Sequence, residues 1–356
     1  MKIMLVTSSL KLGGKEKQII HLFNGLKKYK IDTKLVLFSA LIDRDTINAE
    51  SVLVLKNKSV LLATLSLLKE IFKYKPTIIH TWEHRTTTIC ILLKIFFRYK
   101  IIDGEIRFSR SLDSFRLFKY QRFLNTRLST VVVANTLIGL KNFKLVENFR
   151  ARVIPNGFDI ESFDKVDKSN LLEHNEDYIY IGKIANFTKP KDYLIIVKVI
   201  DKILSTHANV KFIFVGDGPE YLSIKKRINP TWSDRVLFLG KRIDVDAIVK
   251  CFDIGLLLSK PGHSEGMSNS IMEYMAASLP VIATNTGGNT ILINNEINGY
   301  LIPHGDYISL TDCLERLISD KELRLRMGGI NRTLLQERYD IDKMVSKYIS
   351  LYKEVK

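Results

Sequence analysis

Two glutamates, Glu265 and Glu273, are separated by seven residues in a stretch rich in small and polar residues, EGMSNSIMEYMAASLPVIATNTGG. We expect Glu265 to lie in a loop, where its carboxylate can reach a sugar hydroxyl or the developing charge near an anomeric carbon. Glu273 is expected about one turn inside a helix, where it can accept hydrogen bonds from ribose hydroxyls. Small neighbours let the backbone approach such a ligand. Taken alone, this spacing is also common on a solvated helix face.

The segment before these glutamates reads as a turn from a strand into a helix. The apolar run Ile254–Leu258 predicts a strand, and a helix is expected to begin near Ser268 or Asn269. The first turn of a helix presents backbone N–H groups without an intrahelical partner and the positive end of the helix dipole. Together with Gly266 and Met267, this turn is therefore predicted to hold a diphosphate.

A second segment, residues 182–193, brings three lysines close together in sequence. Lys183, Lys189 and Lys191 surround a turn that precedes another predicted helix. Such lysines can neutralise a diphosphate, although a lysine lacks the bidentate fork of an arginine. For each of them the alternative is an ordinary solvated surface charge.

The glutamate pair in this context resembles the E-x7-E signature of the retaining glycosyltransferases of family four, the glycosyl transferases group 1, which have the GT-B fold. Three other segments resemble features of that family, and they occur in the family's order. They are VIPNGFD at 153–159, FVGDGP at 214–219, and 236–240 followed by DIG at 253–255. The resemblance covers nearly all of residues 150–305 and is weaker in the N-terminal half.

The resemblance implies a hexosyl- or N-acetylhexosaminyl-transferase. Such an enzyme moves a sugar from a UDP- or GDP-sugar to a glycan or lipid-linked acceptor in capsule, O-antigen or related polysaccharide synthesis. Transfer retains the anomeric configuration and needs neither a cofactor nor a metal. Lys191 and Glu265 are the implied catalytic residues. The implied donor-binding residues are Gly14, Lys183, Lys191, Glu265, Gly266, Met267, Ser268, Asn269 and Glu273.

The sequence departs from the family pattern at three positions. An arginine usual in the family, five residues before the phosphate-binding lysine, is replaced by Asn186, and either Lys183 or Lys189 can substitute for it. A histidine common after an N-terminal strand is absent, so that Glu105 or Arg107 would occupy its space. The family usually has a glutamate soon after a pair of glycines that corresponds to Gly287 and Gly288. That glutamate is missing here, where Asn289, Thr290 and Ile291 follow the pair.

These departures leave two alternatives open. One is a non-catalytic GT-B scaffold that binds a glycan or a protein partner. The other is a sugar-nucleotide epimerase on the same scaffold, for which the sequence offers no positive indication.

The elements expected to position these residues form two series of strands separated by helices, which is the pattern of parallel, doubly wound sheets. The first series comprises Lys2–Val6, Thr33–Phe38, Ser51–Leu55, Thr77–His80, Lys100–Asp103, Thr130–Ala134 and Ala151–Ile154, with helices such as Lys15–Lys28 and Val60–Tyr74. The second comprises Tyr178–Ile181, Lys211–Val215, Val236–Leu239, Ile254–Leu258 and Pro280–Thr284.

We therefore predict an α/β protein of GT-B type, with two Rossmann-like domains facing across a cleft. The N-terminal domain, residues 1–160, binds the acceptor, and the C-terminal domain, residues 161–340, binds the nucleotide-sugar. A hinge is expected near residues 155–175. A helix at 341–356 is expected to pack back on one of the two halves.

The net charge of +16 lies entirely in the N-terminal half. Residues 1–160 contain 28 Lys and Arg against 12 Asp and Glu, and residues 161–356 contain 26 of each. This asymmetry predicts an anionic partner for the N-terminal half. The three cysteines form no cluster, and no run of eighteen apolar residues occurs. We expect a cytoplasmic protein that is peripheral on the inner face of the membrane.

Residues 107–127 combine six basic and five aromatic residues with a single acid. On a helical wheel, Leu117, Tyr120, Leu124 and Leu128 gather on one side as candidates for the core. Arg116, Phe118, Lys119, Arg122 and Phe123 are among those left on the other side. An exposed face with both basic and large apolar groups is typical of a membrane-interface helix, so an anionic membrane surface is the predicted partner. Single-stranded nucleic acid uses similar ingredients, but we expect no such partner, and a buried helix with basic edges is the third alternative.

Two other groups of residues are considered for metal binding. Asp244 and Asp246 spell a D-x-D tripeptide, but Asp244 precedes a helical run and is better interpreted as an N-cap. A cluster of four residues after the fourth strand is a candidate for acceptor contact rather than metal binding, and it comprises His80, Trp82, Glu83 and His84.

Overall fold

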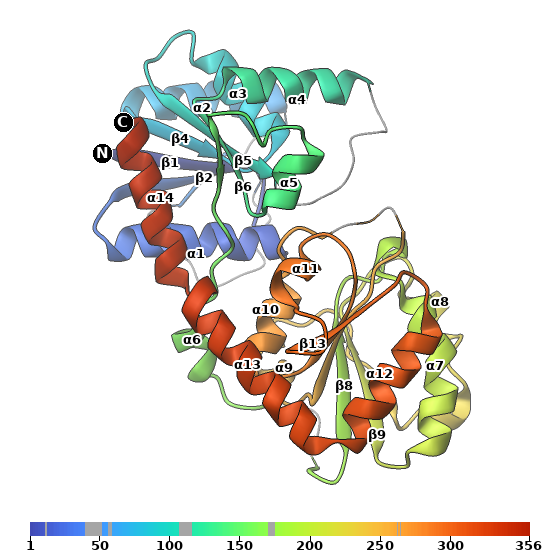
Figure 1. Ribbon diagram of the computed structural model, residues 1–356. Helices are drawn as coiled ribbons and strands as arrows, with labels where there is room; N and C mark the ends of the chain where they lie inside the picture. The colour runs from blue at the N-terminus through green and yellow to red at the C-terminus, as the bar shows by residue number, and fades with distance from the viewer. Residues whose placement is uncertain are drawn as a thin grey trace. The chain divides into compact units, whose positions relative to one another are not determined.

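The computed structural model describes residues 1–10, 13–39, 52–55, 59–106, 116–169, 175–261, 263 and 265–356, with the backbone alone at 116–119. Contacts divide the chain into two units (Figure 1). The N-terminal unit comprises Met1–Phe158 together with Tyr339–Lys356, and the C-terminal unit comprises Asp159–Arg338. The C-terminal segment of the chain thus belongs to the N-terminal unit.

The N-terminal unit is built on a parallel sheet with the strand order β3-β2-β1-β4-β5-β6-β7. Its strands are β1 (Lys2–Thr7), β2 (Asp32–Leu37), β3 (Val52–Val54), β4 (Ile78–Thr81), β5 (Lys100–Ile106), β6 (Val131–Ala134) and β7 (Ala151–Val153). Its helices are α1 (Gly14–Lys28), α2 (Val60–Tyr74), α3 (His84–Leu93), α4 (Arg116–Leu128), α5 (Leu137–Asn142) and α14 (Ile341–Val355).

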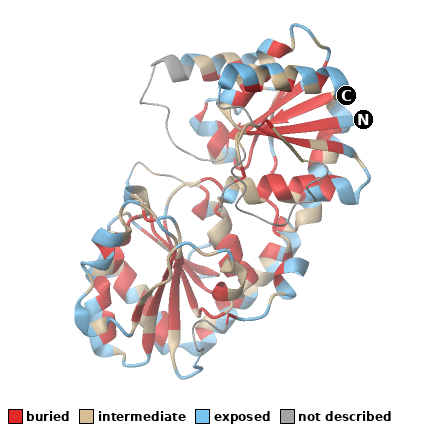
Figure 2. Cartoon of the chain, turned by 180° about the vertical axis from the view of Figure 1, so that it is seen from behind, coloured by how far each residue is buried: buried red, intermediate tan, exposed pale blue. Residues whose placement is uncertain are grey.

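Both faces of this sheet are covered, which explains why its central strands are apolar runs rather than alternating patterns. On one face, α1 and α14 pack together, and Gly25 of α1 leaves the space that Val345 of α14 fills. On the other face, Ala63, Leu67 and Ile71 of α2 share a core with α3 and the strands. Figure 2 shows the buried strands between partly exposed helices.

The C-terminal unit repeats this plan with the order β10-β9-β8-β11-β12-β13. Its strands are β8 (Ile179–Ile184), β9 (Val210–Val215), β10 (Val236–Phe238), β11 (Ile254–Leu257), β12 (Val281–Thr284) and β13 (Gly299–Ile302). Its helices are α6 (Ile160–Asp164), α7 (Tyr193–Thr206), α8 (Tyr221–Lys225), α9 (Val245–Val249), α10 (Asn269–Ala276), α11 (Asn289–Leu292), α12 (Tyr307–Ser319) and α13 (Lys321–Tyr339), the last of which runs one residue into the other unit.

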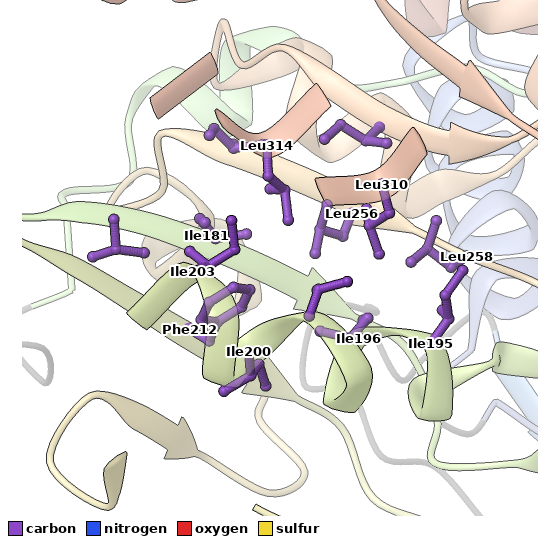
Figure 3. Close-up of a cluster of buried hydrophobic side chains, with 14 of the residues drawn as sticks. Ile181, Ile195, Ile196, Ile200, Ile203, Phe212, Leu256, Leu258, Leu310 and Leu314 are labelled. Carbon is purple, nitrogen blue, oxygen red and sulfur yellow. The ribbon is translucent and has the colours of Figure 1, made fainter. Parts of the chain in front are cut away.

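The main core of this unit lies between the sheet and the helices α7 and α12 (Figure 3). Ile196, Ile200 and Ile203 recur at helical spacing on α7 and point toward the strands. Leu310 and Leu314 do the same from α12. This packing fixes where the loops at the carboxyl ends of the strands begin.

Each sheet has one point at which the strand order reverses direction. The chain moves outward from β8 to β9 and β10, then returns to β11 on the other side of β8. In open α/β sheets, ligands bind at the carboxyl ends of the strands next to such a switch point. In the C-terminal unit this point lies between β8 and β11, whose loops lead to Lys191 and Glu265.

The predicted α/β fold with two Rossmann-like units is confirmed, and twelve predicted strands correspond to β1 through β12 with small shifts at their ends. The sequence did not predict β13, which is four residues long and follows a turn at Asn294–Asn298. Among the described residues, no helix has the length and apolar character needed to cross a membrane.

The wheel drawn for residues 107–127 assigned the wrong face of the helix to the core. Residues 107–115 lie outside the described residues, and in α4 it is Arg122 and Asn125 that are buried. Tyr120 and Leu128, predicted to face the core, are exposed. The reason is polar packing: the Asn125 amide donates to the His84 carbonyl oxygen of α3 over 2.9 Å, and Arg122 lies 3.2 Å from Glu105 of β5.

Candidate active site

Lys191 and Glu265, which lie 74 residues apart in sequence, form an ion pair at the switch point of the C-terminal sheet. Both side chains are about four-fifths buried, with 20% and 18% of their surface exposed. His263 adds a contact of 3.3 Å between its Nε2 and Oε1 of Glu265. Burial would raise the pKa of Glu265, but the Lys191 ammonium and the His263 contact outweigh it and lower the pKa to about 2. The site therefore holds an ionised carboxylate against an ammonium.

The glycine turn after β9 packs against the loop that carries Lys191. A Cβ on Gly216, whose φ is +138°, would lie 2.1 Å from the carbonyl oxygen of Ala185. Phe187 then donates its N–H to Asp217 O over 2.9 Å. This close approach requires a glycine, which gives the FVGDGP segment a structural reason. A short 3-10 turn, Lys189–Lys191, then leads through Asp192 into α7.

The loop that carries Glu265 is held by the glycine pair after β12. Gly288 donates its N–H to the carbonyl oxygen of Glu265 over 2.8 Å. A Cβ on Gly288 would lie 1.8 Å from the carbonyl oxygen of Gly266, so no larger residue fits there. The two loops are also joined directly, because Lys260 donates its N–H to the Pro190 carbonyl oxygen over 3.0 Å.

The helix α10 begins at Asn269, as predicted, with Ser268 as its N-cap. The Ser268 hydroxyl accepts from the Ile271 N–H over 3.4 Å. Tyr274 ties the helix to the switch point, since its hydroxyl accepts from the Ile184 N–H over 2.7 Å and lies 3.3 Å from the Leu256 carbonyl oxygen. The start of α10 is thus fixed relative to both β8 and β11.

The other predicted donor residues surround this helix start. Gly266, Met267 and Ser268 are buried, Asn269 is half-buried, and Glu273 lies in the second turn with 7% of its surface exposed. Lys189 and Asn186 are exposed. Gly14 begins α1 in the N-terminal unit, so its predicted contact with a donor remains a prediction.

Lys183 has surroundings that the sequence did not suggest. It is fully buried on β8, and its Nζ donates to the carbonyl oxygens of Lys191 over 2.6 Å and Leu258 over 3.3 Å. The ammonium also lies 4.5 Å from the centre of the Tyr193 ring. Burial, together with the nearby positive charge of Lys191, lowers the pKa of Lys183 to about 7. One amine therefore joins the loops on both sides of the switch point.

The N-terminal unit gathers charged side chains at the equivalent edge of its own sheet. Glu83 follows β4 and accepts from the Ser8 N–H over 3.0 Å and the Ser8 hydroxyl over 2.7 Å, and it pairs with Lys15. Burial would raise the pKa of Glu83, but Lys15 and Ser8 lower it below its usual value. Glu105 pairs with Arg122, and burial still raises the pKa of Glu105 to about 7. Sequence reasoning missed both pairs, although each carboxylate lies at the carboxyl end of a strand.

Two of the residues considered for acceptor contact prove to be core residues. His80 and Trp82 are almost completely buried, with their ring centres 4.9 Å apart. Nδ1 of His80 lies 2.8 Å from the hydroxyl of Tyr352 in α14. The helix α14 covers the end of β4, which is why these rings face inward. His84, by contrast, is only half-buried and lies 3.8 Å from Glu105.

The D-x-D tripeptide is accounted for by an ion pair. Asp244 occupies the N-cap position of α9, as predicted, but its carboxylate accepts from Arg242 through two contacts of 2.8 Å instead of capping the helix. Within the described ranges, no three His, Cys, Asp or Glu residues gather as a metal site would require. Arg107 lies outside the described residues.

Comparisons with known proteins agree with this geometry. Residues 176–320 match the profile of the family described as glycosyl transferases group 1. Over 99% of both chains, the structure superimposes on that of Anabaena Alr3699/HepE in complex with UDP and glucose, with a TM-score of 0.84 and 20% identity. It also resembles a variant of TarM from S. aureus, solved with fondaparinux, alpha-GlcNAc-glycerol and UDP, with a TM-score of 0.79 and 14% identity.

Two curated relatives share more sequence with the chain. The N-acetyl-alpha-D-glucosaminyl L-malate synthase of Bacillus anthracis is 32% identical over 227 residues, which are 63% of this chain and 58% of that protein. The UDP-Gal:alpha-D-GlcNAc-diphosphoundecaprenol alpha-1,3-galactosyltransferase of Escherichia coli is 30% identical over 216 residues, covering 58% and 55%. The chain thus spans a little over half the length of these relatives.

The fold and the site define the class: this is a GT-B protein. Residues 176–320, most of the C-terminal unit, match the glycosyl transferases group 1, which agrees with the resemblance first seen in the sequence.

Proposed function

We propose that the protein is a glycosyltransferase that moves a hexosyl or N-acetylhexosaminyl group from a UDP- or GDP-sugar to a glycan or lipid-linked acceptor. The observation that supports this most is the buried pair of Lys191 and Glu265 beside the start of α10. Fixed charges of both signs next to a helix N-terminus suit a sugar diphosphate. Relatives named for the transfer of galactose or for capsular polysaccharide synthesis support the same class of reaction.

In this proposal the C-terminal unit binds the donor. The backbone of Gly266, Met267, Ser268 and Asn269 receives the diphosphate at the start of α10. Glu273 accepts hydrogen bonds from the ribose hydroxyls. Glu265 contacts the transferred sugar from the other side of the same loop.

Lys191 acts on the leaving group. When the bond between the sugar and the diphosphate breaks, negative charge grows on the departing phosphate oxygen, and a positioned ammonium stabilises that charge. Glu265 neutralises Lys191, so an incoming diphosphate exchanges one anionic partner of Lys191 for another. We propose that transfer retains the anomeric configuration and requires no divalent cation, because Lys191 and the helix start supply the positive charge.

Lys183 supports this arrangement as a positioning residue. Its amine is buried behind Lys191 and holds the Lys191 carbonyl oxygen rather than a ligand. We propose that it keeps the Lys191 loop and the loop after β11 in register, and that exposed Lys189 is the better candidate for a second diphosphate contact.

The acceptor belongs to cell-surface polysaccharide synthesis in this proposal. We place the protein at the cytoplasmic face of the membrane, attached through its basic N-terminal unit, because a lipid-linked acceptor would be presented there. A non-catalytic scaffold is not favoured, since it would have no use for a buried ion pair at the donor position.

Thermal shift with nucleotides tests the donor site. UDP or GDP should raise the melting temperature, because a ligand that binds only the folded state stabilises it by mass action. Glu273→Ala should abolish most of that shift, whereas Glu322→Ala, an exposed acid on α13, should leave it unchanged. A wild-type protein that responds to neither nucleotide would refute the donor site.

A further inference from the structure

One layer of the N-terminal unit has an unusual outer surface. The helices α2, α3 and α4 lie on the same face of the sheet (Figure 1), with α2 and α3 sharing a core and α3 bonded to α4 through Asn125. Within 59–106 and 120–128, every exposed residue except Ser59 is either large and apolar or basic. The apolar ones are Val60, Leu61, Leu62, Leu65, Phe72, Leu92, Ile95, Phe96, Tyr120, Phe123 and Leu128. The basic ones are Lys69, Lys73, Lys75, Arg85, Arg98 and Arg127, together with Lys100 at the start of β5.

The helix α2 shows that this surface is not an accident of packing. Its inner stripe, Ala63, Leu67 and Ile71, is buried at a spacing of four residues. A second apolar stripe lies on the opposite side of the helix, where Leu61, Leu65 and Phe72 are 69%, 53% and 66% exposed. A helix in contact with water on its outer side is normally polar there, so two apolar stripes imply two apolar environments.

The acids of this layer do not offset its positive charge. Glu70 and Glu83 are only partly exposed and are paired with Lys34 and Lys15. Asp103 and Glu105 are buried. The outer surface therefore presents basic groups beside large apolar side chains, with no exposed carboxylate among the described residues of the layer.

We infer that this surface, which we call the α2–α4 face, docks on an anionic lipid bilayer. Lysine and arginine side chains attract anionic headgroups, and leucine and phenylalanine side chains enter the boundary with the acyl chains. A nucleic acid would use the basic residues but not Leu61, Leu65 and Leu62. A second copy of the chain would bring the same positive charge against itself. The inference rests on the proposed membrane location and names the residues responsible, which differ from the helix face predicted from the sequence.

Vesicle sedimentation tests the inference with two variants of α2. The stripe variant carries Leu61→Ser, Leu65→Ser and Phe72→Ser, and the charge variant carries Lys69→Glu and Lys73→Glu. The matched controls alter equally exposed residues of the C-terminal unit. They are Leu222→Ser with Ile308→Ser and Leu325→Ser, where 68%, 61% and 60% of each residue is exposed, and Lys202→Glu with Lys226→Glu.

The wild type should sediment with vesicles of phosphatidylglycerol and phosphatidylcholine but not with phosphatidylcholine alone. Each basic residue near an anionic surface contributes roughly fivefold to binding, so two charge reversals should weaken it by about a hundredfold or more. Raising the salt from about 0.1 M to about 1 M should reduce wild-type binding without abolishing it, because salt does not screen apolar burial. The stripe variant should lose that salt-resistant fraction, and both controls should bind as the wild type does.

Three results would overturn the inference. The first is a wild type that does not bind anionic vesicles. The second is that both α2 variants sediment with vesicles as the wild type does. The third is a wild type that forms a dimer and binds no vesicles, while the stripe variant is a monomer. The UDP thermal shift, measured on every variant, separates this inference from the donor proposal. A normal UDP shift in the stripe variant shows that its donor site is intact. A wild type that binds vesicles but shows no UDP shift refutes the donor site and leaves the α2–α4 face supported.

Discussion

The two units of this protein share one architecture but place their functional residues differently. In the C-terminal unit the distinctive charges lie inside, where Lys183, Lys191 and Glu265 meet at the switch point of the sheet. The charges of this unit, Asp159–Arg338, nearly cancel, with 22 basic and 24 acidic residues. In the N-terminal unit a group of exposed basic residues lies on the α2–α4 face, next to exposed apolar side chains.

The buried charged side chains of the two units also differ in their partners. In the N-terminal unit, Glu105 and Arg122 neutralise each other within the protein. In the C-terminal unit, Lys183 is held by carbonyl oxygens, and no carboxylate among the described residues lies within ion-pair distance of it. A doubly wound sheet thus serves as a rigid support in both units. In the proposed function, one unit uses its loops for chemistry, and the other uses the outer side of its helices for attachment.

The largest expected effect is on catalysis at Lys191. Lys191→Ala should lower kcat/KM by roughly a hundredfold to a thousandfold, about 2–4 kcal/mol of transition-state stabilisation, as for the loss of an oxyanion donor. The melting temperature of the free protein should fall as well, because the mostly buried Glu265 carboxylate loses its ammonium partner, so kcat/KM is compared at a temperature at which both proteins are folded. Lys202→Ala, which alters an exposed lysine on α7 outside the donor loops, is the matched control and should leave kcat/KM unchanged. Activity of Lys191→Ala within threefold of the wild type would move the role to another cation.

The second effect concerns the stability of the C-terminal unit at Lys183. Burial depresses the pKa of this amine to about 7 in the folded state. Between pH 7 and the pKa of the lysine in the unfolded chain, the unfolded chain therefore binds more protons than the folded protein. The free energy of unfolding should therefore rise with pH, by about 2 kcal/mol between pH 7 and pH 9. Lys183→Met should lose this rise, which denaturant unfolding at the two pH values measures.

The proposed positioning role of Lys183 also predicts how the same variant changes catalysis. Lys183→Met should lower kcat more than it changes the affinity for UDP, and Lys183→Arg should not restore activity, because the larger guanidinium does not fit a fully buried site. A wild type whose stability is flat between pH 7 and pH 9 would show that the amine is not buried as described.

The donor loops could be predicted from sequence because their residues are consecutive or carry glycines at fixed places. The start of α10 at Asn269 follows from Ser268 as an N-cap, and Gly288 and Gly216 are required by backbone contacts within 3 Å. The burial of Lys183 could not be predicted, because it depends on Leu258, 75 residues further on, closing over the same strand edge.

The sequence placed a basic and apolar surface on residues 107–127, whereas the inferred α2–α4 face takes most of its residues from α2 and α3. A helical wheel assumes that the apolar side of a helix is the buried side, and α4 violates that assumption by burying Arg122 and Asn125 against β5 and α3. The sequence of α2 was identified as a helix, but its two apolar stripes resemble one continuous apolar run until the position of the sheet is known. Which side of a helix meets water is decided by tertiary contacts made elsewhere in the chain.

A smaller effect is expected where α14 closes the N-terminal unit. Tyr352→Phe removes the hydroxyl that contacts His80 over 2.8 Å in the core. The loss of one buried hydrogen bond should lower the free energy of unfolding by about 1–2 kcal/mol. The UDP-induced thermal shift should be unchanged, because the substitution lies in the unit that does not carry Lys191. A change in that shift would show that a core residue of the N-terminal unit affects the binding of UDP.

The smallest effect separates the two stripes of α2. Leu65→Ser, on the outer stripe, should change the free energy of unfolding by no more than about 0.5 kcal/mol, because surface substitutions away from special features rarely do more. Leu67→Ser, on the inner stripe two residues away, places a hydroxyl in the core and should cost about 3 kcal/mol or more. Both substitutions alter the same residue type on the same helix, so differences in helix propensity cancel. If Leu65→Ser destabilised the protein as much as Leu67→Ser, then Leu65 would be packed against another part of the chain, and the outer stripe would belong to the core rather than to a membrane-binding surface.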